Sequence, residues 1–261
     1  MSGLGSVFET CRAESRAALI GYLPAGYPTV EGSKDVLRTM VSAGCDVVEV
    51  GLPFSDPVMD GPTIQRAAEQ ALRGGFRVRD LFGVVESVAA AGGRAVVMTY
   101  WNPVLAYGVD RFARDLAAAG GLGVITPDLV PDEGSEWIEA TDAHDLDRIF
   151  LVAPSSTEER IRMTARSSRG FLYATSVMGV TGARDVVSSA APALVKRVRE
   201  HTDLPVGVGL GVRNGAQAAE LAAFADGVIV GSAFVSAVQD DGVAALTEEL
   251  ANGVRRAATP A

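Results

Sequence analysis

The chain has 261 residues, of which 48% are hydrophobic and 21% charged, and its formal net charge is −9 at pH 7. This length and composition are typical of one globular α/β-barrel domain and exclude a disordered chain. The negative charge argues against nucleic acid or an anionic membrane surface as a partner, and no apolar run approaches the roughly 20 residues that span a bilayer.

The N-terminal segment, Met1–Glu9, has neither the basic start nor the apolar run of a signal peptide. The two cysteines, Cys11 and Cys45, cannot supply a zinc-type spacing. We therefore expect a cytoplasmic protein that begins with a short helix at about residues 4–15.

Short runs rich in β-branched residues recur along the chain, and each is followed by a helix-like segment. We predict eight strands, at Ala18–Leu23, Asp46–Val50, Ala95–Tyr100, Gly123–Thr126, Arg148–Val152, Phe171–Thr175, Pro205–Gly209 and Gly227–Val230. Amphipathic spacing predicts helices at Val30–Ala43, Asp110–Ala119, Glu158–Ser167 and Val186–His201, with Gly44 and Gly120 ending the first two.

Nearly continuous apolar runs such as Val228-Ile229-Val230 are typical of parallel strands that are buried on both faces. Eight strands that alternate with helices, without a break in composition, predict a single-domain (β/α)8 TIM barrel over residues 1–261. An open doubly wound sheet is the alternative. We expect the C-terminal tail, at about residues 256–261, to fray.

The active site of such a barrel lies on the loops that follow the strands, at the C-terminal face. Lys34 and Lys196 fall inside predicted outer helices, which disfavours a Schiff-base mechanism. His144 and His201 precede strands and so belong to the opposite face, which disfavours a metal aldolase or a histidine base. Carboxylates, hydroxyls and backbone groups remain for chemistry, and no metal site is expected.

Glu49 interrupts the apolar run of the second strand, where an ionised side chain pays a large desolvation cost. Burial should raise its pKa, as suits a group that gives and takes protons near neutrality. A structural glutamate bonded to nearby backbone is the other interpretation. Asp60 ends the loop after this strand, where Pro53, Pro57 and Pro62 stiffen the chain, and turn formation is as plausible for it as catalysis.

Three glycine-containing loops follow neighbouring strands, at Met178–Gly182, Gly207–Gly211 and Val230–Ala233. Glycines let backbone N–H groups approach a phosphate closely, and barrels commonly hold phosphate after strands 7 and 8. The sequence therefore predicts a phosphorylated substrate.

Several aromatic and apolar residues fall near the C-terminal ends of the predicted strands. Tyr173 could point inward toward Glu49, although its position alone favours core packing. A wall for a flat apolar group could be made by Tyr22, Tyr100, Trp101 and Ile125.

The segment from Asp46 to Gln65, DVVEVGLPFSDPVMDGPTIQ, closely resembles the signature of tryptophan synthase α subunits. The resemblance extends along nearly the whole chain, through Gly21–Pro28, Met98–Pro103, Pro127–Leu129, Gly179–Gly182 and Gly231–Ala233. It implies a lyase of tryptophan biosynthesis that cleaves indole-3-glycerol phosphate into indole and glyceraldehyde 3-phosphate.

The resemblance also implies roles for single residues. Glu49 matches the acid/base, Asp60 the carboxylate that faces the indole N–H, and Tyr173 the tyrosine beside them. Phosphate-binding positions are matched by Gly182, Gly211, Gly231 and Ser232. Thr181 matches the residue that closes the site and orients Asp60, and Pro53 and Asp56 match the loop that communicates with a β subunit.

The family pattern implies an α2β2 assembly in which the β subunit, not this chain, carries pyridoxal phosphate. One departure is Val177-Met178, which stands where many family members have a basic and then a small residue, so loop closure could differ in detail. Two alternative functions stay open at this stage, a sugar-phosphate epimerase or isomerase on the same fold and a catalytically silent activating subunit.

Overall fold

A computed structural model describes residues 3–175, 190–209 and 211–256. The strands in this part of the chain are β1 Ala18–Pro24, β2 Val47–Gly51, β3 Ala95–Met98, β4 Gly123–Ile125, β5 Asp147–Ile149, β6 Leu151–Val152, β7 Leu172–Thr175, β8 Val206–Gly209 and β9 Gly227–Val230. The helices are α1 Gly3–Ala13, α2 Val30–Ala43, α3 Pro62–Arg73, α4 Val78–Ala90, α5 Trp101–Tyr107, α6 Val109–Ala118, a 3-10 turn at Pro131–Glu133, α7 Ser135–Ala143, α8 Glu158–Ser167, α9 Ala190–Arg199, α10 Gly215–Ala222, α11 Ser232–Ala237 and α12 Val243–Arg256.

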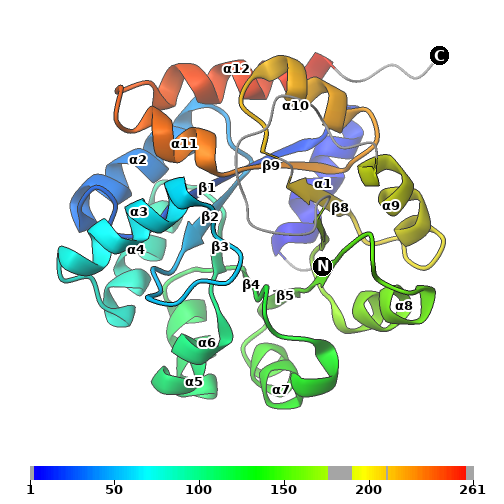
Figure 1. The fold of residues 1–261 in the computed structure, drawn as a ribbon, viewed down its shortest axis with the longest axis horizontal. Helices are drawn as coiled ribbons and strands as arrows, with labels where there is room; N and C mark the ends of the chain where they lie inside the picture. Colours follow the sequence, from blue (N-terminus) through cyan, green and yellow to red (C-terminus); the bar gives the residue numbers. More distant parts are fainter. Residues whose placement is uncertain (1–2, 176–189, 210, 257–261) are drawn as a thin grey trace.

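The strands form one parallel sheet in the order β5-β4-β3-β2-β1-β9-β8-β7-β6. Its two end strands, β5 and β6, are consecutive in the chain and separated only by Phe150, so the sheet closes on itself. The helices surround this ring, as Figure 1 shows. The predicted TIM barrel is therefore confirmed, and the open doubly wound sheet is wrong. The predicted strand Arg148–Val152 is observed as two short strands.

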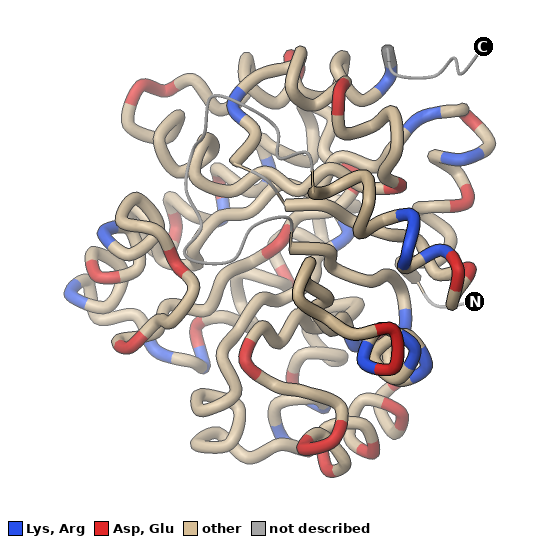
Figure 2. The backbone as a smooth tube through the Cα atoms, turned by 45° about the vertical axis from the view of Figure 1, so that its right-hand side comes forward, with Lys and Arg blue, Asp and Glu red and all other residues tan. Residues whose placement is uncertain are grey.

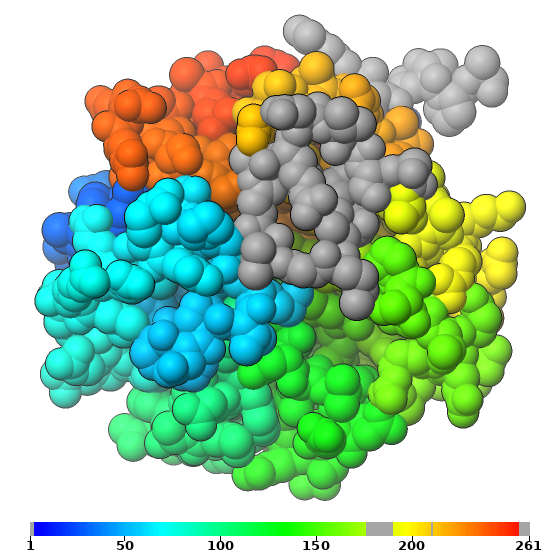
Figure 3. Space-filling model, in the orientation of Figure 1, coloured from blue at the N-terminus to red at the C-terminus, as the bar shows by residue number. Residues whose placement is uncertain are grey.

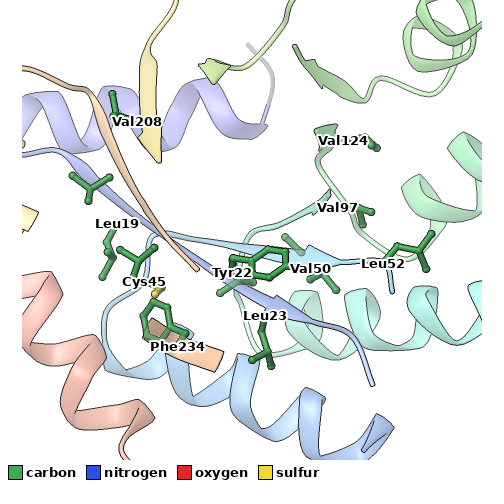
Figure 4. Close-up of a cluster of buried hydrophobic side chains, with 14 of the residues drawn as sticks. Leu19, Tyr22, Leu23, Cys45, Val50, Leu52, Val97, Val124, Val208 and Phe234 are labelled. Carbon is green, nitrogen blue, oxygen red and sulfur yellow. The ribbon is translucent and has the colours of Figure 1, made fainter. Parts of the chain in front are cut away.

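Alternation along the strands separates the two sides of the barrel wall. Ile20, Val47, Val96 and Ile229 belong to one buried cluster in the barrel interior. Their neighbours along the strands pack outward against the helices, as Leu19 and Leu23 of β1 do in Figure 4, which also labels Phe234 of helix α11. Because both faces of each strand are buried, the strands carry the continuous apolar runs that the sequence displays.

Helix α1 closes the end of the barrel at the start of the strands. Its buried residues Leu4, Val7, Phe8 and Cys11 join the interior cluster, and the ring of Phe8 lies 5.5 Å from that of Phe171. The helix ends earlier than predicted, at Ala13, because Ser15 has a φ of 53°, which is incompatible with a continuing right-handed helix.

The helix α2 has the bounds that its sequence predicts. The side chain of Thr29 accepts a hydrogen bond from the N–H of Gly32 at its start, and Gly44 ends it with a φ of 121°. Gly120 follows the end of α6 and also has a positive φ. Charged residues lie mainly on the outer helices and loops, as Figure 2 shows.

Further predicted boundaries need correction. The third strand ends at Met98 rather than Tyr100, because Tyr100 already serves as the N-cap of α5. Arg256 belongs to α12 rather than to a frayed tail, and residues 257–261 lie outside the described part. Among the described residues, no helix combines the length and apolar character needed to cross a bilayer.

Candidate active site

Glu49 lies inside the barrel near the C-terminal end of β2. It pairs in register with Tyr22 of β1 and Val96 of β3, and it shares the inward face of β2 with Val47. Its side chain is 1% exposed, and Oε2 has no hydrogen-bond partner among the described residues. Burial, with a smaller contribution from the negative charge of Asp60, raises the pKa of Glu49 to about 8.

Asp60 lies at the end of the loop between β2 and α3. The hydroxyl of Tyr100 donates a hydrogen bond to Asp60 Oδ1 over 2.9 Å and accepts one from the Met59 N–H over 3.0 Å. The side-chain amide of Gln65 donates to the Asp60 carbonyl over 2.8 Å. Burial raises the pKa of Asp60, and the hydrogen bond from Tyr100 opposes that rise. Hydrogen bonds thus hold both the backbone of this loop and the carboxylate of Asp60 in place.

Tyr173 of β7 also belongs to the interior cluster. Burial and the charge of Glu49 raise its pKa well above the usual range of a tyrosine, so its hydroxyl stays protonated. A Cβ placed on Gly209 of β8 would lie only 2.3 Å from this hydroxyl oxygen. Gly209 therefore provides the space that the Tyr173 hydroxyl occupies.

Tyr22 is buried beside the same groups. Burial is the main cause of its raised pKa, followed by the charges of Asp60 and Glu49. A Cβ on Gly51 would lie 2.4 Å from the Tyr22 hydroxyl oxygen, so this strand end too must be glycine for the ring to fit.

The remaining wall is apolar. Ile125 of β4 is fully buried in the interior cluster, and Phe54 lies with its ring 5.4 Å from that of Tyr100. Trp101, proposed as wall material from sequence, instead packs against Trp137 of α7. The structure thus brings Tyr22, Ile125 and Tyr100 to the carboxylate end of the barrel.

Of the residues predicted to bind phosphate, the structure describes Gly211, Gly231 and Ser232. Gly211 follows β8 and has a φ of 65°, which glycine adopts without strain. Gly231 is the N-cap of α11, and Ser232 is its first residue, directly after the neighbouring strand β9. Thr181, Gly182 and the unusual pair Val177-Met178 lie outside the described residues.

The two residues predicted to contact a β subunit both lie in the loop after β2 but differ in exposure. Pro53 is buried, whereas Asp56 is exposed and accepts a hydrogen bond from the Ser55 hydroxyl over 2.5 Å. Val58 of the same loop is 67% exposed, which is unusual for a large apolar side chain.

The groups that the sequence analysis excluded lie away from this site. Lys34 and Lys196 are on α2 and α9, and His144 and His201 precede β5 and β8, where they pair with Asp110 and Glu158. Within the described ranges, no cluster of three or more His, Cys, Asp or Glu residues could hold a metal ion. Among the residues that the structure describes at this end of the barrel, carboxylates and tyrosine hydroxyls are the groups that can transfer protons.

Sequence reasoning missed the bond between Tyr100 and Asp60 and the role of Phe54 beside it. Tyr100 was expected only as part of an apolar wall. A hydrogen bond that spans 40 residues between two loops leaves no periodic signal in the sequence.

Comparisons with known proteins agree in one description. A family model for the tryptophan synthase alpha chain matches residues 8–259. The tryptophan synthase alpha chain of Nocardia farcinica is 70% identical over 258 residues, covering 98% of this chain and 97% of that one. A solved chain of Mycobacterium tuberculosis tryptophan synthase aligns with a TM-score of 0.95 at 65% identity, covering 97% of this chain and 98% of that chain. The tryptophan synthase subunit alpha of Legionella pneumophila aligns with a TM-score of 0.89 at 30% identity, covering 98% and 99%.

Proposed function

This chain belongs to the tryptophan synthase alpha chain family, and we propose how its own residues perform that family's reaction. The reaction is the retro-aldol cleavage of indole-3-glycerol phosphate to indole and glyceraldehyde 3-phosphate. Membership does not favour the two alternative functions, the sugar-phosphate epimerase or isomerase and the silent activating subunit. The observation that carries the residue-level proposal is the buried Glu49, whose Oε2 has no hydrogen-bond partner among the described residues and whose pKa is raised to about 8.

Glu49 is the general acid and then the general base. Its carboxyl proton goes to C3 of the indole ring, which becomes a cation. The bond between C3 and the first side-chain carbon then breaks, and its electron pair restores the aromatic ring. The hydroxyl on that side-chain carbon loses its proton to Glu49 as the aldehyde forms. Glu49 gives one proton and regains one, so the cycle closes.

Asp60 stabilises the positive charge that develops at the ring N–H, for which it must be ionised. The hydrogen bond from Tyr100 supports this role, because it favours the charged form of the carboxylate. Tyr173 lies beside Glu49, as its electrostatic coupling to that carboxylate supports, and it helps to orient the reacting side chain.

The substrate's two ends bind in different ways. Gly182, Gly211, Gly231 and Ser232 hold the phosphate, chiefly through backbone N–H groups, and the position of Gly211 and Gly231 after adjacent strands supports this. Tyr22, Tyr100 and Ile125 form the wall against the indole ring, and Thr181 closes the site. The chain's net charge of −9 makes such local phosphate donors necessary.

The chain works with a tryptophan synthase β subunit in an α2β2 assembly, in which pyridoxal phosphate belongs to the partner. Pro53 shapes the contact loop and Asp56 lies on its surface. In the described part of the chain, the exposed large apolar residues are Val58, Leu105 and Val130, at 67%, 49% and 40%, and they follow β2, β3 and β4 in turn. Figure 3 shows the segments after these strands bordering one another on one face. Exposed apolar side chains on bordering segments suit a protein partner.

The proton transfers above need neither a metal ion nor a cofactor, and we propose that this chain uses none and acts in the cytoplasm. The test is to incubate the purified chain with indole-3-glycerol phosphate and measure indole release, with and without a chelator. We expect chelator-resistant indole formation. Glu49→Gln should abolish it while substrate still binds, and an active Glu49→Gln variant would refute the assignment.

A further inference from the structure

Tyr100 stands at the start of helix α5 and also bonds to Asp60, and its side chain cannot both cap the helix and bind that carboxylate. It is the N-cap residue of α5, with extended backbone angles of −69° and 157°, and it makes no side-chain capping bond. Its hydroxyl is instead engaged with Asp60 and with the Met59 N–H. The first N–H groups of α5 therefore need an acceptor from elsewhere in the fold.

Asp128, in the loop after β4, supplies that acceptor. The N–H of Trp101, the first residue of α5, donates to Asp128 Oδ1 over 2.9 Å and to Oδ2 over 3.1 Å. A carboxylate is the favoured capping group at a helix start, because it accepts hydrogen bonds and carries negative charge. Asp128 thus performs the capping that a tyrosine at position 100 cannot.

Trp101 is also held by helix α7, which follows β4 in the barrel. Its indole ring packs against Trp137 of α7, with the ring centres 5.7 Å apart and the planes at 64°. The start of α5 is therefore fixed both by the loop after β4 and by the helix that follows it. Tyr100 is the residue immediately before this fixed point.

We propose that Asp128 is a positioning residue for the lyase reaction. By capping α5 it fixes the backbone of Tyr100, and through the Tyr100 hydroxyl it holds the carboxylate of Asp60 in place. This inference rests on the proposed role of Asp60. Asp128 itself is exposed and acts only through Tyr100.

The experiment compares Asp128→Ala with Asp132→Ala, which removes a nearby carboxylate, in the 3-10 turn after β4, that pairs with Arg160 of α8. We expect Asp128→Ala to lower kcat/KM about tenfold, as the loss of a cap displaces the groups that it orients. The acidic limb of its pH profile should move to higher pH, because Asp60 loses part of the bond that favours its ionised form. Asp132→Ala should keep the wild-type profile.

Two further variants separate positioning from loss of folding. Asp128→Asn retains an acceptor oxygen and should recover most of the activity, whereas Asp128→Glu retains charge but displaces it and should not. In a Tyr100→Phe background, Asp128→Ala should cause no additional loss, since both act on Asp60 by one route.

A wild-type profile for Asp128→Ala, an equal loss in Asp132→Ala, or losses that multiply in the double variant would overturn the inference. Glu49→Gln is measured in parallel. If it is inactive while Asp128→Ala behaves as wild type, only this inference fails. If Glu49→Gln is active, the proposed function itself is refuted.

Discussion

The hydroxyl of Tyr100 donates a 2.9 Å hydrogen bond to the carboxylate of Asp60, across 40 positions of the chain. The bond links the loops after two neighbouring strands, and it opposes the rise in the pKa of Asp60 that burial causes. It therefore holds the carboxylate assigned to the indole N–H in place and favours its charged form.

Tyr100→Phe should move the acidic limb of the kcat/KM profile to higher pH. Removal of the hydrogen bond removes the interaction that lowers the pKa of Asp60, so Asp60 takes up a proton at a higher pH than before. Activity should thus fall more at pH 6 than near neutrality. Tyr107→Phe is the matched control, because it removes a 2.7 Å bond from a tyrosine to Asp115 away from the site. A limb that does not move in Tyr100→Phe would contradict this role.

Glu49→Gln should change how stability depends on pH. The folded-state pKa of Glu49 is about 8, above its ordinary value of 4.5, so the folded protein keeps a proton that the unfolded chain releases between these values. The free energy of unfolding of the wild type should therefore fall relative to Glu49→Gln as pH rises, by about 1.4 kcal/mol per pH unit in that window. Urea unfolding from pH 5 to pH 9 measures this difference. If the free energy of unfolding depends on pH in the same way in the wild type and in Glu49→Gln, the raised pKa of Glu49 is contradicted.

Gly209→Ala should damage the site through Tyr173. The added Cβ would lie 2.3 Å from the hydroxyl oxygen and 2.9 Å from Cζ, so the tyrosine must move. We expect kcat/KM to fall by roughly ten- to a hundredfold. Gly83→Ala, in α4, has no heavy atom within 4 Å of its Cβ and should leave activity unchanged while raising stability by about 0.5–1 kcal/mol. Full activity of Gly209→Ala would contradict the close packing assigned to Tyr173.

Leu105→Asp should weaken binding of a tryptophan synthase β subunit. Leu105 is 49% exposed on α5, and a charge there would be desolvated on docking. We expect a loss of affinity of at least tenfold by titration calorimetry, a modest value for burial of an unpaired charge. Asn252→Asp, on the exposed side of α12, adds the same charge elsewhere and should bind as wild type does. If Leu105→Asp and Asn252→Asp bind the β subunit equally well, Leu105 is not part of the docking surface.

The barrel could be predicted because its strands carry a local signal. Runs such as Val228-Ile229-Val230 show burial on both faces, and a carboxylate within such a run, as at Glu49, must be buried too. Capping residues such as Thr29 and Gly44 act on their own helix, so their effect is also visible in the sequence.

The features that could not be predicted depend on closure of the barrel. The third strand stops at Met98 because Tyr100 is needed as an N-cap and as a partner of Asp60. The fifth predicted strand divides around Phe150, where β5 pairs with β4 and β6 with β7. Both depend on neighbours that are distant in the sequence, and no local pattern encodes them.

The central claim is that Glu49 is still largely protonated at neutral pH and so has a proton to give to an aromatic carbon. Difference infrared spectroscopy of the wild type against Glu49→Gln measures this directly through the carbonyl stretch of a protonated carboxyl group. We predict a band that is present at pH 7, absent from the variant, and lost with a midpoint near pH 8. A band that is already gone at pH 7, with a midpoint near 4.5, would contradict the account.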